Sequence, residues 1–198
     1  MARPPRFDSD QILDAAVRLA AASGPGGVTM SAVAQEVGAP SGSVYHRFSG
    51  RPALLAEVWL RTVERFQEGW FSAVDGDPDP RRAARAAARH VVSWSRAHPQ
   101  EASLLLHGPE EFGRSEWSEE HRARADAGNA RAFAALRGLG TALGAAGAVD
   151  RERVALAVID LPLSLVRRHL RADDAMPAYA EQLAEECADG LIEVGPKP

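Results

Sequence analysis

Apolar residues recur at helical spacing along this 198-residue chain, and the first apolar stripe lies near its N-terminus. Ile12 and Leu19 fall on one face of a helix, seven residues apart. Asp8 and Gln11 have the spacing of a capping box, which marks the start of such a helix. The sequence Ser-Gly-Pro-Gly-Gly at residues 23–27 would stop it abruptly. The pattern therefore predicts a first helix between these two boundaries.

The next apolar pattern predicts two short helices joined by a tight turn within residues 29–48. Thr29 can cap the first helix through its hydroxyl, and Gly38 can adopt the positive φ that ends it. Val44 and Phe48 lie four residues apart, so both face inward from the second helix. This arrangement has the form of a helix-turn-helix, whose second helix enters the major groove of DNA. A helical hairpin in a bundle core has the same pattern, but the flanking helices favour the DNA-reading unit.

Further stripes and breaks predict a helical body after this unit. The predicted helices run from about Ala53 to Val74, Ala83 to Ala97, Ala102 to Leu106, Ser118 to Leu143, Asp150 to Leu170, and from Ala175 or Met176 onward. Asp150 is predicted to cap its helix, and Pro162 is predicted to kink the same helix. The sequence thus predicts an all-α fold, with a three-helix head in residues 1–50 and a helical body in residues 51–198.

The residues that the second short helix leaves outside are candidates for contact with DNA. The predicted DNA-binding residues are Thr29, Ser41, Gly42, Ser43, Tyr45, His46, Arg47 and Arg51. The small polar residues and the histidine would face the groove, whereas the threonine, the tyrosine and the last arginine would hold phosphates. Arg47 could reach either a guanine edge or a phosphate. Arg3 and Arg6 could form an arm along the DNA or an ordinary solvated tail.

The same segment is similar to the TetR family of bacterial transcriptional regulators. The similarity covers roughly the first quarter of the chain and runs through Gly24, Thr29, Val33, Ala34, Gly38, Gly42, Ser43, Val44, Tyr45, His46, Phe48, Arg51, Pro52, Ala53, Leu54 and Leu55. Pro40 and Ser41 depart from it, because the family often has a polar residue and a lysine there. The resemblance implies a repressor that binds a palindromic operator as a homodimer and is released by a small-molecule ligand. The lysine's absence motivates an alternative, a helical interaction protein or small-molecule-binding bundle that no longer binds DNA.

Two apolar stripes near the C-terminus are candidates for the dimer surface. The first stripe consists of Leu156, Ile159, Leu163 and Val166, and the second consists of Leu183, Cys187 and Leu191. Such stripes usually belong to the core of a single chain. One reader helix covers only a few base pairs, however, so useful specificity requires two copies. The family resemblance likewise implies a homodimer through the last two helices, paired as a four-helix bundle.

Residues in the middle of the chain could line a ligand cavity. The candidates are Trp94, Leu105, His107, Phe112, Trp117 and Phe133. The aromatic and aliphatic side chains would supply apolar walls, and the histidine would supply a polar contact. The alternative is that these side chains simply fill the core of the body, which is the commoner use of such residues. The resemblance alone supplies the idea of an unidentified small-molecule inducer.

Charge and composition limit the other classes of protein. The net charge of −4 argues against general coating of nucleic acid, whereas a local DNA-binding surface remains compatible with it. Through residue 52 there are five arginines and four acidic residues, so the head carries +1. No histidine follows an acidic residue by three positions, and no phosphate loop, dinucleotide fingerprint or nucleophile elbow occurs. We therefore expect no enzyme activity, no cofactor and no metal. A lone cysteine, with no signal peptide or membrane-length apolar run, predicts a cytoplasmic protein.

Overall fold

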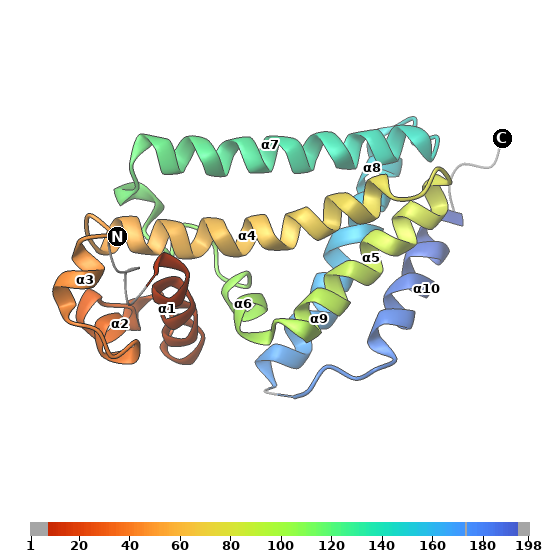
Figure 1. The fold of residues 1–198 in the computed structure, drawn as a ribbon. Helices are drawn as coiled ribbons and strands as arrows, with labels where there is room; N and C mark the ends of the chain where they lie inside the picture. Colours follow the sequence, from red (N-terminus) through yellow and green to blue (C-terminus); the bar gives the residue numbers. More distant parts are fainter. Residues whose placement is uncertain (1–7, 173, 194–198) are drawn as a thin grey trace, which may run out of the picture. The chain divides into compact units, whose positions relative to one another are not determined.

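The computed structural model describes residues 8–172 and 174–193, and every regular element among them is helical (Figure 1). The α-helices are α1 (Ser9–Ser23), α2 (Met30–Glu36), α3 (Ser41–Tyr45), α4 (Arg51–Asp75), α5 (Pro80–Ala97), α6 (Pro99–Leu104), α7 (Glu119–Ala142), α8 (Ala148–Ala155), α9 (Leu161–Arg171) and α10 (Ala180–Glu193). Two 3₁₀ turns, η1 (Pro25–Gly27) and η2 (Arg114–Glu116), and one π-helical turn, η3 (Leu156–Asp160), connect them. The predicted all-α class is confirmed.

The chain divides into two compact units that do not follow sequence order. Unit 1 consists of Met1–Val63 and Gln100–Asp126, and unit 2 consists of Glu64–Pro99 and Ala127–Pro198. Helices α4 and α7 therefore each contribute residues to both units. The division between head and body at residue 50 stays a prediction.

Unit 1 has a core to which the helix-turn-helix and a later segment both contribute. Ile12 of α1, Val33 of α2 and Val44 of α3 are fully buried in it. Phe112 and Trp117 belong to the same cluster, although they follow the helix-turn-helix by more than sixty residues. The Trp117 indole Nε1 donates a hydrogen bond to the Phe112 carbonyl at 2.9 Å. Burial of large aromatic side chains supplies much of the stability of such a unit.

The start of α1 is defined by side chains and by an ion pair to α4. The Asp8 carboxylate accepts from the Gln11 backbone N–H at 2.8 Å, and the Gln11 side chain accepts from the Asp8 N–H at 3.3 Å. The predicted capping box is therefore confirmed. The Arg61 Nη2 of α4 lies 2.7 Å from the Asp14 carboxylate. This contact joins the two helices beside the shared apolar core.

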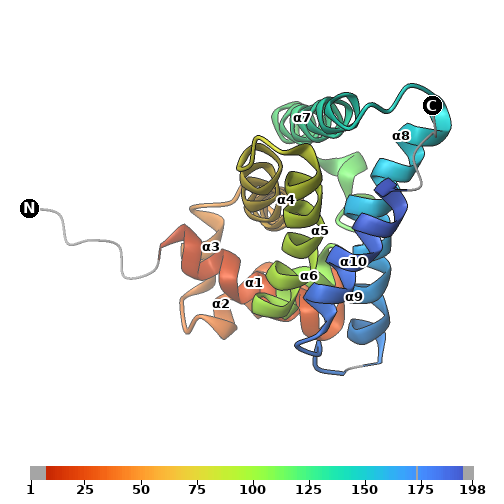
Figure 2. The same cartoon turned by 90° about the vertical axis from the view of Figure 1, so that its right-hand side faces the viewer.

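Unit 2 is organised around α5, which packs against α9, α10 and η3 (Figure 2). The buried face of α5 consists mainly of small side chains, namely Ala83, Ala84, Ala87, Ala88, Val91 and Val92. Alanines at these positions allow neighbouring helices to approach closely. The exposed arginines of the same helix pair with acidic residues of α10. Arg89 and Arg96 both contact the buried Glu181, and Arg85 lies 3.3 Å from Glu185.

The segment predicted as one helix from Asp150 to Leu170 is interrupted. Gly147 rather than Asp150 precedes the first helical residue, and the Asp150 carboxylate accepts from the Gly147 N–H at 3.3 Å. The chain then forms the π-helical turn η3 before Pro162. Proline has no N–H to donate to the preceding turn, and a π turn accommodates that loss. Asp150 is therefore not the N-cap residue, but its carboxylate still caps the helix from the third helical position. The sequence predicted a kink at Pro162, and the irregularity present there is the π-helical turn η3.

The last helix also begins later than predicted. α10 starts at Ala180, not at Ala175 or Met176. Pro177 disfavours helical backbone at the residue before it, and its carbonyl accepts from the Ala180 N–H at 3.0 Å in a turn. This turn delays the first full turn of the helix.

Candidate nucleic-acid interface

Local capping bonds hold α2 and α3 as a compact pair (Figure 1). The Thr29 hydroxyl accepts from the Ala32 N–H at 3.1 Å and so caps α2. Gly38 follows α2 with φ of 67°. The Gly38 N–H donates to the Gln35 carbonyl at 3.1 Å, and the Ala39 N–H donates to the Ala34 carbonyl at 2.9 Å. These two bonds form a Schellman motif, which requires the left-handed residue that glycine supplies.

α3 is held by its apolar side and leaves its polar side open. Val44 is fully buried and Phe48 is 7% exposed, as their spacing predicted. Ser41, Gly42, Tyr45 and His46 are exposed, and the Tyr45 side chain reaches 58% exposure. Ser43 and Arg47 are half-buried at the edges of this face. The reader face, which we define as these six exposed and half-buried residues, is therefore a small, polar and open surface of unit 1.

Two of the predicted phosphate contacts already have partners inside the protein. The Thr29 hydroxyl is engaged by its cap, although it also lies on the exposed surface. The guanidinium of Arg51 donates from Nε to the Val28 carbonyl at 2.7 Å and from Nη2 to the Pro25 carbonyl at 2.9 Å. The sequence offered no signal for these contacts, because the acceptors are backbone atoms 23 and 26 residues earlier. Arg3 and Arg6 lie outside the described residues.

The predicted ligand residues do not form one cluster. Phe112 and Trp117 are buried in the core of unit 1, where they pack with α1, α3 and α4 residues. Trp94 lies in unit 2, stacked on His98 with ring centroids 4.9 Å apart. His107 lies 2.7 Å from Glu111, a contact that lowers the pKa of the Glu111 carboxyl. Leu105 is half-buried.

Phe133 differs most from its predicted place in an apolar wall. Its side chain is 63% exposed on α7. The buried residues of unit 2 that α7 supplies, such as Leu139, lie on another face of the helix. Leu139 lies six residues further along the helix and therefore projects from a different side than Phe133, and the exposure of Phe133 places its side chain outside the core. Phe133 therefore does not lie in an enclosed apolar wall, where the sequence predicted it.

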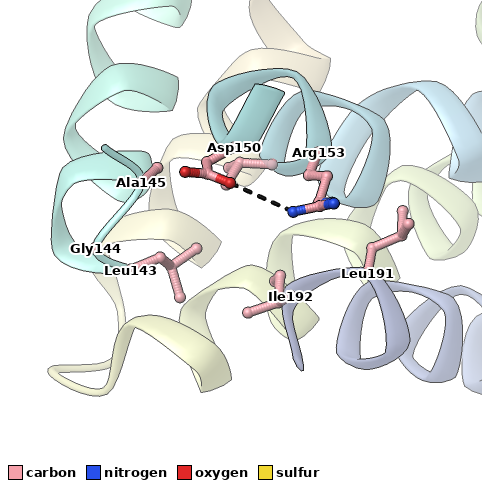
Figure 3. Close-up of a pocket in the computed structure, with 8 residues that line it drawn as sticks. Leu143, Gly144, Ala145, Asp150, Arg153, Leu191 and Ile192 are labelled. Atoms are coloured by element: carbon pink, nitrogen blue, oxygen red, sulfur yellow. Dashed lines mark hydrogen bonds and ion pairs between the residues drawn. The ribbon is translucent and has the colours of Figure 1, made fainter. Parts of the chain in front are cut away.

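A small cavity lies in unit 2 between the turn that follows α7 and the helices α8 and α10 (Figure 3). Leu143, Leu191 and Ile192 provide apolar walls, and the Asp150 carboxylate lies 3.3 Å from Arg153 across its rim. Its volume of ≈ 30 Å³ suits a water molecule rather than an inducer. None of the predicted ligand residues lines this cavity.

Two further features of the described residues bear on other classes of site. In residues 8–172 and 174–193, no group of three or more histidine, cysteine or acidic side chains is placed to hold a metal ion. Within the same part of the chain, no helix combines the length and apolar character needed to cross a bilayer.

The N-terminal part of the chain matches a known family. Residues 12–58 fit the family described as bacterial regulatory proteins, tetR family. The matched segment contains α2, α3 and the beginning of α4. The HTH-type transcriptional repressor DrrR1 of Streptomyces coeruleorubidus is 36% identical over 95 residues, which are 48% of this chain and 34% of that protein. The chain thus spans about a third of the length of the curated relative that it matches.

Solved structures resemble the whole fold. The TetR family regulator PfmR from Thermus thermophilus gives a TM-score of 0.69 at 24% identity, with 98% of this chain and 100% of that chain covered. The regulator FadR from Bacillus subtilis in complex with stearoyl-CoA gives a TM-score of 0.72 at 16% identity, with 96% and 100% covered. At these identities the likeness concerns the fold.

Proposed function

We propose that this chain is a DNA-binding transcriptional repressor of the TetR family of bacterial regulatory proteins, whose family model its helix-turn-helix segment matches. The observation that carries the proposal is the reader face of α3, which is polar and open while Val44 and Phe48 anchor its other side. A helix of this kind inserts into the major groove, where base edges differ between all four base pairs. Repression is the simplest action, because occupying a promoter requires no further contact with polymerase. A bundle that has lost DNA binding is not favoured, since the match covers the helix-turn-helix itself.

The proposed contacts divide into two kinds. Ser41, Gly42, Ser43 and His46 read base edges in the groove. Thr29, Tyr45 and Arg47 contact the phosphate backbone and set the register of the helix on the duplex. The exposure of Tyr45 supports this division, because a ring that is 58% exposed contributes little to the core.

A homodimer through α9 and α10 would present two reader faces to a palindromic operator. Leu161 of α9 and Leu183 of α10 are 40% and 39% exposed, which is unusual for leucines of a core. Both line one groove of unit 2, together with Pro162 and Cys187. A second copy of the chain would cover this apolar groove. The four-helix bundle that the family resemblance implies uses the same two helices.

We also propose that a small molecule releases the operator. The support is family membership and fold, since FadR from Bacillus subtilis was solved in complex with stearoyl-CoA. A one-component regulator of this kind acts where the chromosome is, so we propose a cytoplasmic location.

The test is selection of bound fragments from the genome that encodes the chain. Purified protein should retain a small set of fragments that share an inverted repeat, and His46→Ala should change which fragments are retained. Arg81→Ala, an exposed change on α5, provides a matched control that should leave the set unchanged. Retention of no fragment at low salt, or of all fragments equally, would overturn the proposal.

A further inference from the structure

Arg51 is the first residue of α4 and directly follows the helix-turn-helix segment. Its guanidinium faces back toward the segment that precedes α2. The Nε atom donates to the Val28 carbonyl at 2.7 Å, and Nη2 donates to the Pro25 carbonyl at 2.9 Å. Two nitrogens of the planar guanidinium thus donate hydrogen bonds to two backbone carbonyl oxygens. The fixed geometry of arginine allows this pair of bonds, whereas a lysine ammonium does not reproduce it.

The two acceptors lie just before the cap of α2, in the turn Pro25–Gly27 and at the residue after it. The Ala32 N–H donates to the Thr29 hydroxyl, so the cap takes the donor that could otherwise serve the Val28 carbonyl. Among the described residues, the Arg51 side chain is the hydrogen-bond donor to that carbonyl. Val28 itself is fully buried, and a buried carbonyl without a partner is costly. Arg51 therefore satisfies a backbone group that the cap leaves open.

These bonds also connect the two ends of the helix-turn-helix segment. The donor lies at the start of α4, after α3 in the chain, and the acceptors lie in the segment before α2, so the bonds close residues 29–50 into a loop. Closing a loop of this length restricts how its two helices tilt against α4. The reader face is part of that loop, so its orientation depends on the bonds at its ends.

We propose that Arg51 is a positioning residue of the DNA-binding unit: its guanidinium holds the entry of α2 against the start of α4, and through this contact fixes the orientation of α3. This inference rests on the proposed function and replaces a phosphate contact as the main role of the side chain. The two roles make different demands on charge. A phosphate contact needs a cation, whereas a positioning role needs two N–H groups in a fixed fork.

The test compares Arg51→Ala and Arg51→Lys by operator affinity over a range of salt concentrations. Both variants should bind roughly 10- to 100-fold more weakly on every operator sequence, the loss that corresponds to one charged hydrogen bond. The slope of log affinity against log salt should stay that of the unchanged protein. A phosphate contact would instead lower this slope by about 0.9 in Arg51→Ala and retain affinity in Arg51→Lys, and this result would overturn the inference. Arg81→Ala controls for the loss of one positive charge.

A measurement without DNA separates this inference from the proposed function. Hydrogen exchange of the amides at residues 30–34 should be about tenfold faster in both Arg51 variants, because the entry of α2 opens more often. Unchanged exchange there would also overturn the inference. If the unchanged protein retained no genomic fragment, the proposed function would fail, while the exchange result would still decide whether Arg51 holds α2.

Discussion

Gly38 and Gly42 lie four residues apart in the helix-turn-helix, and only the first has a backbone that favours glycine. Gly38 has φ of 67°, and a Cβ added there would meet no atom within 4 Å. Gly42 lies inside α3 and has equally open space. Gly38→Ala should therefore lower the free energy of unfolding by about 1–2 kcal/mol through backbone strain alone. Gly42→Ala, the matched control, should be neutral or raise it by up to about 1 kcal/mol. Urea denaturation of both variants measures the difference, and equal effects would contradict the assignment.

Removing the Tyr45 hydroxyl tests whether this residue contacts a phosphate and not a base edge. Tyr45→Phe removes only the hydroxyl, from a ring that is 58% exposed. Operator affinity should fall by roughly tenfold on every sequence, because one phosphate hydrogen bond is lost. The unfolding transition should remain unchanged. Ser43→Ala and His46→Ala should instead change the preferred sequence, as measured by binding to a library of operator variants. Uniform losses in all three variants would argue against the division.

His90 makes stability depend on pH. Burial lowers the pKa of His90 below its ordinary 6.5, and its Nε2 lies 3.0 Å from the Phe66 carbonyl. The unfolded chain therefore binds a proton more readily, so this contribution to stability is present above 6.5 and is lost as the pH falls toward the lowered pKa. His90→Gln keeps an N–H donor and should reduce the loss of stability between neutral and mildly acidic pH. Denaturation curves at several pH values test this expectation. The same pH dependence in the variant and in the unchanged protein would contradict it.

Between helices, the contact of α5 with α10 includes one buried carboxylate. Glu181 is 4% exposed and pairs with both Arg89 and Arg96. Glu181→Gln would leave two arginines without their shared partner, so the free energy of unfolding should fall by about 1–3 kcal/mol. That range is below the full cost of a buried pair, because both arginine side chains are about half exposed.

Asp189 offers a matched control on the same pair of helices. Its carboxylate lies 3.4 Å from Arg85, and both side chains are substantially exposed. Asp189→Asn should therefore change stability by less than about 1 kcal/mol. Thermal denaturation of the two variants compares a buried with an exposed ion pair. A larger effect at Asp189 would show that solvent exposure does not govern the strength of these contacts.

The elements that the sequence predicted well are those with local boundary signals. The cap at Asp8, the cap at Thr29 and the left-handed Gly38 each act within a few residues, so α1 and α2 follow from the sequence. The open face of α3 follows from the same spacing, because Val44 and Phe48 set its buried side.

The features that the sequence did not predict depend on contacts between distant residues. From the sequence, Trp117 could be core, which is the commoner use of such a residue, or a cavity wall, and its burial in the core of unit 1 decides for core. Arg51 has no local cue either, since its acceptors are backbone oxygens more than twenty residues earlier. Local spacing thus predicts elements and exposed faces, whereas partners of long side chains require the fold.

For the whole molecule, charge is distributed unevenly along the chain. The head through residue 52 carries +1 and the total is −4, so the remainder carries −5. A negative body opposes binding of DNA anywhere except at a locally positive or neutral surface. This distribution favours a regulator that discriminates between sites over one that coats DNA.

At the scale of the whole molecule, we propose that operator binding depends on dimerisation through α9 and α10. Leu161 and Leu183 line one apolar groove and are each about 40% exposed. Replacing both with glutamate would place two charges in the proposed interface, so the dimer should dissociate at least tenfold more readily. A single reader helix then contacts one half-site, and affinity for the full inverted repeat should fall to that for a half-site.

Val149 gives the control for this prediction, because its side chain is 66% exposed at the start of α8 and does not line that groove. Val149→Glu should leave both the dimer and operator affinity unchanged. Sedimentation velocity over a range of protein concentrations measures the dimer, and titration of full and half operators measures the consequence. Should the double leucine variant remain dimeric while Val149→Glu dissociates, the interface would lie elsewhere on the molecule. A variant that is monomeric yet binds the full repeat as tightly as before would separate dimerisation from operator recognition, and the proposed mode of binding would have to be abandoned.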